Sequence, residues 1–206
     1  MSAKNYNRVR AGKIAKQSEI PSETEVAKDY DLGEVNLINK NHTKADAGSY
    51  SIKCSKSSST QVHLPTLPSL IQAIPEIQSV EHILQKFLGS KGSTRQSGRL
   101  NNKQLPSKEV ALVCEVLDSV TYEITDLCIG DVEGVIWRDT KKNKDYIQTK
   151  QELLNRVSSA RWVALPGAYH LRLPNSNKSL LTIQRKGSGT NYPQFRLYRN
   201  LLNDPI

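Results

Sequence analysis

The sequence has little cysteine and no long hydrophobic run, and each absence argues against a class of protein. Its three cysteines, Cys54, Cys114 and Cys128, are odd in number and show no CxxC spacing, so neither a disulfide framework nor a zinc site is supported. No segment approaches the ~20 apolar residues that cross a bilayer, and the basic N-terminus has no apolar signal-peptide core. We therefore expect a soluble, cytoplasmic protein that makes no membrane contact.

Signatures of several enzyme classes are also missing from the sequence. The histidines are scattered, without an HxxxH or HxH pair that would suggest a metal site. The GxSxG elbow of serine hydrolases is absent, as are the glycine patterns that bind nucleotide phosphates and dinucleotides. The sequence therefore supports neither a serine or cysteine hydrolase nor a bound small-molecule cofactor.

Positive charge is abundant in this chain. The formal net charge is +9 at pH 7, which favours a polyanionic partner, and nucleic acid before membrane. Residues 89–108 carry five basic side chains, Arg95 and Arg99 among them, and no acidic one. Basic side chains on a Gly- and Ser-rich loop are suited to phosphate contacts, although a solvated linker explains the same composition.

The pattern along the chain predicts a loop-rich basic N-terminal region over residues 1–66, in which 50–56 forms one strand, and a compact α/β (α+β) domain over 67–206. Hydrophobic residues make up 37% of the chain, enough for a packed core. Thr149 and Glu152 fit a capping box at the start of a helix. The other elements expected are helices over 75–88 and 108–119, and strands over 120–129, 132–137 and 169–173.

The stretch SLLTIQRKGSGTNYPQFRLY, residues 179–198, combines a core strand with polar side chains. Because successive side chains of a strand alternate between its faces, Gln184 and Lys186 point to one side and Arg185 to the other. An amide and an ammonium group side by side at the end of an apolar strand indicate a site rather than packing.

GDVEGVIW followed downstream by LTIQRKGSG resembles the PD-(D/E)xK nucleases, and more narrowly the type II restriction endonucleases. The resemblance covers residues 107–198, and Gln184 stands where most members carry an acid. It implies a restriction-endonuclease-like mixed central sheet flanked by helices. It also implies Mg²⁺-dependent, sequence-specific hydrolysis of phosphodiester bonds in double-stranded DNA, as part of a restriction-modification system. A symmetric duplex target favours a homodimer with one site per strand.

The resemblance also assigns roles to individual residues. Asp131 would be the charged Mg²⁺ ligand, Gln184 a neutral ligand, and the main-chain carbonyl of Arg185 a further one, since Mg²⁺ prefers hard oxygens. Lys186 would hold the attacking water, and Glu115 would be an additional acid. The residues expected to contact DNA are Arg185, Ser188, Asn191, Gln194 and Arg196, together with Arg95 and Arg99 of the basic loop.

Other interpretations remain open at this point. Asp126 or Asp118 could replace Asp131 as the acid, Gln184 could bridge two strands, and Lys186 could be an edge-strand charge that discourages aggregation. The alternative function is that of a basic nucleic-acid-binding protein without catalysis. A nuclease with another substrate, such as a junction resolvase, is a third hypothesis.

Overall fold

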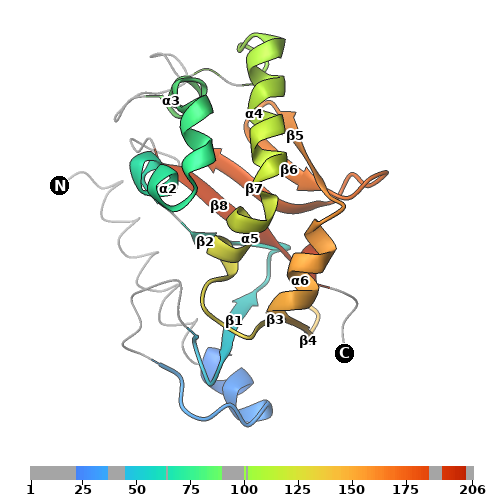
Figure 1. The fold of residues 1–206 in the computed structure, drawn as a ribbon. Coiled ribbons are helices and arrows are strands. Elements are labelled where there is room, and N and C mark those ends of the chain that lie inside the picture. Colours follow the sequence, from blue (N-terminus) through green and yellow to red (C-terminus); the bar gives the residue numbers. More distant parts are fainter. Residues whose placement is uncertain are drawn as a thin grey trace, which may run out of the picture.

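A computed structural model of the chain describes residues 22–36, 45–63, 65–89, 100, 102–185 and 192–202. Its strands form two sheets, with helices packed on them (Figure 1). The smaller sheet consists of β1 (Tyr50–Ser55), β3 (Gly134–Asp139) and β4 (Lys144–Thr149). The larger sheet consists of β2 (Ser59–His63), β5 (Arg161–Leu165), β6 (Ala168–Arg172), β7 (Ser179–Arg185) and β8 (Pro193–Tyr198).

The smaller sheet is mixed, because β1 runs parallel to β3 and β3 antiparallel to β4. One face carries Ile52 and Ile136, which pack with Val26 of the helix at residues 22–29 in a small separate core. The other face carries Val135 and Trp137, which belong to the main core. The sheet is therefore buried on both faces.

The larger sheet is antiparallel throughout, in the order β2–β8–β7–β6–β5. Alternate side chains such as Tyr169, Ile183 and Phe195 are buried in the main core. Helices α3 and α4 cover this face in Figure 1. The period of two along these strands places polar side chains on the opposite face.

The helical elements are α2 (Leu67–Ala73), α3 (Glu81–Leu88), α4 (Ser107–Ser119), α5 (Thr121–Ile129) and α6 (Lys150–Val157), with 3-10 turns η1 (Pro75–Val80) and η2 (Arg199–Leu201). The capping box is confirmed: Glu152 N donates to Thr149 Oγ1 at 3.2 Å, and Thr149 N donates to the Glu152 carboxylate at 2.8 Å. The expected helix over 75–88 is present as η1 followed by α3. The helix expected from residue 108 is α4.

The structure confirms a mixed α and β architecture and corrects two sequence expectations. The segment 120–129, expected as a strand, is helix α5. Its two threonines tolerate the helix because each hydroxyl donates to the carbonyl one turn earlier, Thr121 to Leu117 at 2.9 Å and Thr125 to Thr121 at 2.7 Å. The strands also lie in two sheets where a single central sheet was expected.

The N-terminal third contributes to both sheets. Strand β1 pairs with β3, and β2 pairs with β8, so residues 50–63 are built into the body of the molecule. All three cysteines lie in the described part of the chain and are free. Across the described residues, no helix has both the length and the apolar character needed to span a membrane.

Candidate active site

Asp131 lies in the short connection between α5 and β3. Gly130, with φ of 85°, ends α5, and its N–H donates to the carbonyl of Asp126 at 2.8 Å. Asp131 is exposed, and β3 begins at Gly134 after a short bend. The sequence prediction that this carboxylate precedes a buried strand is therefore confirmed.

Asp46 organises a second turn, immediately before β1. One oxygen of its carboxylate, Oδ2, accepts hydrogen bonds from Ile52 N at 2.7 Å, Ser51 Oγ at 3.0 Å and Lys53 Nζ at 3.1 Å. The turn closes through Asp46 N, which donates to the carbonyl of Tyr50 at 2.8 Å. The Lys53 and Asp46 side chains keep 24% and 25% of their surface exposed, so this ion pair is accessible to a ligand.

The two turns meet because β1 and β3 are parallel neighbours that start side by side. Tyr50 is registered with Gly134, Glu133 N donates to the carbonyl of Ser49 at 2.8 Å, and Ser49 Oγ donates to the Glu133 carboxylate. A Cβ at Gly134 would lie 2.5 Å from the carbonyl oxygen of Gln148 and 2.7 Å from the Tyr50 ring. Only glycine therefore allows this close approach of the strands.

A hollow of about 430 Å³ lies at this junction. Its lining residues are Asp131, two residues from the segment before the Asp46 turn, Glu34 and Asn36, and three residues of that turn, Ala45, Ala47 and Gly48. Among the described residues, the carboxylates that border the hollow are thus those of Asp131 and Glu34. Carboxylate oxygens are the hard ligands that Mg²⁺ prefers, commonly one or two of them completed by water and substrate phosphate.

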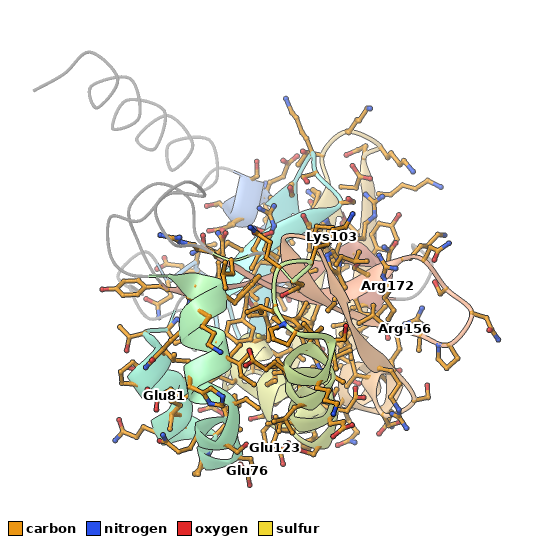
Figure 2. The ribbon with its side chains drawn as sticks, turned by 90° about the horizontal axis from the view of Figure 1, so that it is seen from above. Glu76, Glu81, Lys103, Glu123, Arg156 and Arg172 are labelled. Atoms are coloured by element: carbon orange, nitrogen blue, oxygen red, sulfur yellow. The ribbon has the colours of Figure 1, made fainter. Side chains whose placement is uncertain are left out.

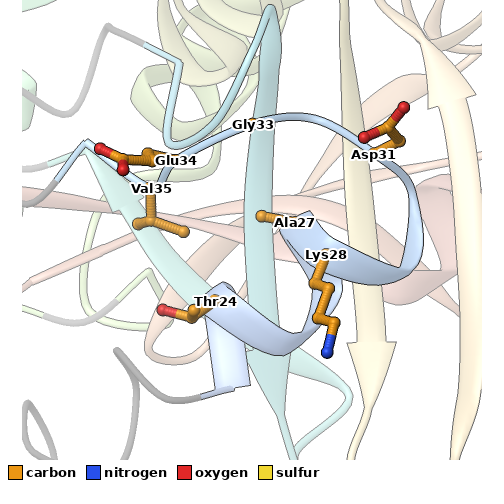
Figure 3. A pocket seen from close by; sticks show the side chains of 7 residues that line it. All are labelled: Thr24, Ala27, Lys28, Asp31, Gly33, Glu34 and Val35. Atoms are coloured by element: carbon orange, nitrogen blue, oxygen red, sulfur yellow. The ribbon is translucent and has the colours of Figure 1, made fainter.

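A neighbouring hollow of about 560 Å³ shares Glu34 but has a different character. It lies between the helix of residues 22–29 and the loop that follows it. Figure 3 shows the side chains of Asp31 and Glu34 pointing away from each other across this loop, with Lys28 directed to a third side. These charged groups do not converge on a common point, so the Asp131 hollow is the better candidate for chemistry.

The two alternative acids have other partners. Asp126 forms an ion pair with Lys150 Nζ at 2.7 Å, and the same ammonium donates to the carbonyl of Gly130 at 2.8 Å. Asp118 accepts the backbone N–H of Trp162 at 2.7 Å and so anchors β5 to α4. Asp126 therefore stabilises the turn before Asp131, and Asp118 has a structural contact.

Gln184 lies in the larger sheet, on a strand that does not pair with β3. Its Nε2 donates to Gln194 Oε1 at 2.9 Å, and Gln194 Nε2 donates to Gln61 Oε1. The three amides form a ladder across β7, β8 and β2. The structure thus gives Gln184 the strand-bridging contact that the sequence analysis kept open, and it does not place Gln184 on a strand next to Asp131.

The remaining sequence candidates are dispersed. Arg185 is buried, 5% exposed, on β7, and Glu115 is exposed on α4. Arg196 donates from Nη2 to Ser59 Oγ at 3.0 Å. The residues that lie outside the described part of the chain are Lys186, Ser188, Asn191, Arg95 and Arg99.

Sequence reasoning missed Asp46, Ser51, Lys53 and Glu34. The available signal was the segment ADAGSYSIK, in which an aspartate and a turn glycine precede a strand. Ser51 and Lys53 lie two apart on that strand and so share a face, the same pattern that drew attention to Gln184 and Lys186. What the segment does not show is that Asp46 turns back onto Lys53.

No group of three or more His, Cys, Asp or Glu side chains is placed to hold a metal ion among the described residues. Asp131 and Glu34 line one hollow and carry the type of oxygen ligand that Mg²⁺ prefers, whereas Gln184 is not on a strand neighbouring Asp131. Comparison with protein-family models gave no match, and comparison with curated proteins gave none either.

Proposed function

We propose that this chain is a Mg²⁺-dependent endonuclease that hydrolyses phosphodiester bonds in double-stranded DNA, of the sequence-specific restriction type. The observation that carries the proposal is the Asp46–Lys53 ion pair, formed in a turn whose Ala45, Ala47 and Gly48 line the same hollow as Asp131 and Glu34. A lysine on a strand next to acidic groups is the residue combination that the resemblance to PD-(D/E)xK nucleases led us to seek. In this proposal the mixed sheet of β1, β3 and β4 is the counterpart of the restriction-endonuclease central sheet.

The residue chemistry suits phosphodiester hydrolysis. Asp131 and Glu34 would hold the Mg²⁺ ion, which when bound supplies a Lewis acid for the phosphate and a more acidic water. The Lys53 ammonium, positioned by the Asp46 carboxylate at 3.1 Å, would bind a phosphate oxygen and neutralise the charge that develops there. Ser51 Oγ donates to the same Asp46 oxygen and so supports the orientation of the carboxylate.

A second candidate function is a nucleic-acid-binding protein without catalysis. It is favoured by the amide ladder of Gln184, Gln194 and Gln61, which gives Gln184 a structural contact in place of a metal. The net charge of +9 suits both functions. The two differ in whether duplex DNA is cut or only bound.

The test is digestion of a plasmid of mixed sequence with Mg²⁺ or with EDTA. We expect discrete Mg²⁺-dependent fragments from the wild type, and a loss of rate of about 10²–10³-fold in Lys53→Ala. Asp131→Asn should lose activity as well. Lys56→Ala is the matched control, because Lys56 is an exposed lysine just beyond the end of β1.

The other outcomes discriminate between the hypotheses. Activity that survives Lys53→Ala but is lost in Lys186→Ala would move the active site to the segment after β7. Duplex DNA that is bound and stays intact with Mg²⁺ would support the non-catalytic function. Smears without discrete fragments would indicate a nuclease of another specificity. We also propose a homodimer, because the duplex target is symmetric. Light scattering on the purified protein tests it.

A further inference from the structure

Charge is distributed unevenly over the molecule. The sequence contains no acidic residue between Glu152 and Asp204, but eight basic ones. These are Arg156, Arg161, Arg172, Lys178, Arg185, Lys186, Arg196 and Arg199. Figure 2 shows Lys103, Arg156 and Arg172 on one side of the molecule and Glu76, Glu81 and Glu123 on the other. These three glutamates lie on η1, α3 and α5, whereas Arg161, Arg172, Arg185 and Arg196 lie on β5 to β8.

The larger sheet turns a polar face away from that helical layer. Pairing places Val163, His170, Thr182 and Arg196 in one row across β5, β6, β7 and β8. Val163 at the β5 end of this row is exposed, and Thr182 on β7 is buried. Neighbouring rows hold the Arg161–Arg172 pair and the Gln184–Gln194 pair. Two of the residues predicted from the sequence to contact DNA, Gln194 and Arg196, therefore share this face with two further arginines.

Arg161 and Arg172 are directly opposite each other on the antiparallel strands β5 and β6. Like charges at such positions destabilise a sheet. Neither arginine forms an ion pair with a carboxylate in the described part of the chain. Arg161 Nη1 donates to the carbonyl of Ala160 at 2.9 Å, and the buried Nε of Arg172 has no hydrogen-bond partner among the described residues. The pair therefore concentrates positive charge, and no carboxylate of the described residues neutralises it.

The pair borders a hollow of about 470 Å³ at the end of the sheet. Arg161 and Arg172 form one side, Val163 and Leu165 extend it along β5, and the turn of residues 173–177 closes it. The turn adds the polar side chains of Asn175, Ser176 and Asn177. Planar guanidinium groups beside amide and hydroxyl groups match the oxygens of a phosphate, which arginine can bind in a bidentate manner.

We propose that Arg161 and Arg172 bind a backbone phosphate of duplex DNA in this hollow, and that the β5–β6 end of the polar face is a DNA contact surface separate from the Asp46–Asp131 site. This inference rests on the proposed function, because it takes DNA as the ligand. Contacts of this kind position the duplex and add affinity without reading bases. They would hold DNA on the molecule through a surface that the hydrolytic site does not include.

The test measures binding of a short fluorescent DNA duplex of mixed sequence in EDTA, as a function of salt. Losing one phosphate contact reduces the magnitude of the slope of log affinity against log salt by about 0.9, so Arg161→Ala/Arg172→Ala, which removes that one contact, should reduce it by about 1. Lys141→Ala/Lys142→Ala is the matched control. It removes the same charge from two exposed lysines whose backbone N–H groups, which bind Asp139, are unchanged.

Arg161→Lys/Arg172→Lys keeps both positive charges, so it distinguishes a loss of charge from a loss of folded structure. It should keep most of the salt slope, and its thermal unfolding shows whether the sheet edge tolerates substitution. Equal slopes for the arginine and lysine double-alanine variants would overturn the inference, as would a wild type that binds no duplex. Cleavage is assayed separately with Mg²⁺. A salt slope that depends on the two arginines, without any cleavage, would overturn the proposed nuclease function and support the DNA contact surface.

Discussion

At the residue scale, folding changes the pKa of His170 enough to be measured. It lies on β6, and its Nδ1 is 2.7 Å from Ser179 Oγ. Burial, and after it the charge of Arg172, lowers the pKa of His170 from 6.5 to about 4. The folded protein therefore binds fewer protons than the unfolded chain between these values.

The sign of the linkage follows from that difference. Stability should rise as pH increases from about 4 to 6.5, because the unfolded histidine is charged in this range and the folded one is neutral. His170→Asn should remove this part of the dependence, as measured by urea unfolding at a series of pH values. Arg172→Ala should raise the pKa of His170, as followed by NMR titration. An unchanged pH profile in His170→Asn would contradict the prediction.

At the element scale, the helix of residues 22–29 is held to the smaller sheet by one arginine. Arg138 Nη2 contacts Asp29 at 2.7 Å, and its Nε and Nη2 bind the two oxygens of Asp145 at 2.8 and 2.6 Å. Tyr30 OH donates to Asp145 at 2.9 Å. The Arg138 hydrogen bond lowers the pKa of Asp145 below its ordinary value of 3.8, so this stabilisation is lost as pH falls through the lowered pKa.

Arg138→Ala should therefore release this helix. The Arg138 and Asp145 side chains are 12% and 13% exposed, and removing the arginine from this partly buried network should cost about 1–3 kcal/mol. We expect faster hydrogen exchange over residues 22–29 and smaller changes in β7. Lys28→Ala removes an exposed charge from the same helix and should leave its exchange unchanged. Equal exchange in both variants would show that Val26 and its apolar neighbours hold the helix without the arginine.

Local signals predicted some elements well and one wrongly. The sequence predicts the capping box of α6 and the apolar face of α4, because the residues that form each of them lie within a few positions of one another. Helix α5 was not, because TYEITDLCI is rich in residues that favour strands. Burial of Ile124 and Cys128, and hydroxyl bonds back to the helix carbonyls, override that propensity.

At the scale of the whole molecule, the candidate site depends on contacts that no local pattern records. Ser49 and Glu133 are 84 positions apart in the sequence, yet they join the Asp46 turn to the Asp131 turn. The sequence identified Asp131 as a carboxylate before a buried strand, but its pairing with Gln184 assumed that β3 and β7 are neighbours. Parallel pairing of β1 with β3 instead makes the N-terminal segment the partner of Asp131.

The two sheets share the main core, and one ion pair adds a link between them. Arg199, after β8, binds Asp139 at the end of β3, and its guanidinium lies 5.2 Å from the centre of the Tyr146 ring on β4. Asp139 is 1% exposed. Arg199→Ala leaves this carboxylate buried without its counter-ion, at an expected cost of about 3–5 kcal/mol.

The only two tryptophans report on one sheet each, Trp137 on β3 and Trp162 on β5, and both are buried in the main core. Trp137→Phe and Trp162→Phe each leave a single reporter for urea unfolding by fluorescence. We expect coincident transitions, because one continuous core unfolds cooperatively. Arg199→Ala should shift both reporters equally to lower urea. If the Trp137 signal is lost first in that variant, the ion pair and not the shared core is what couples the sheet of the candidate active site to the sheet of the arginine pair.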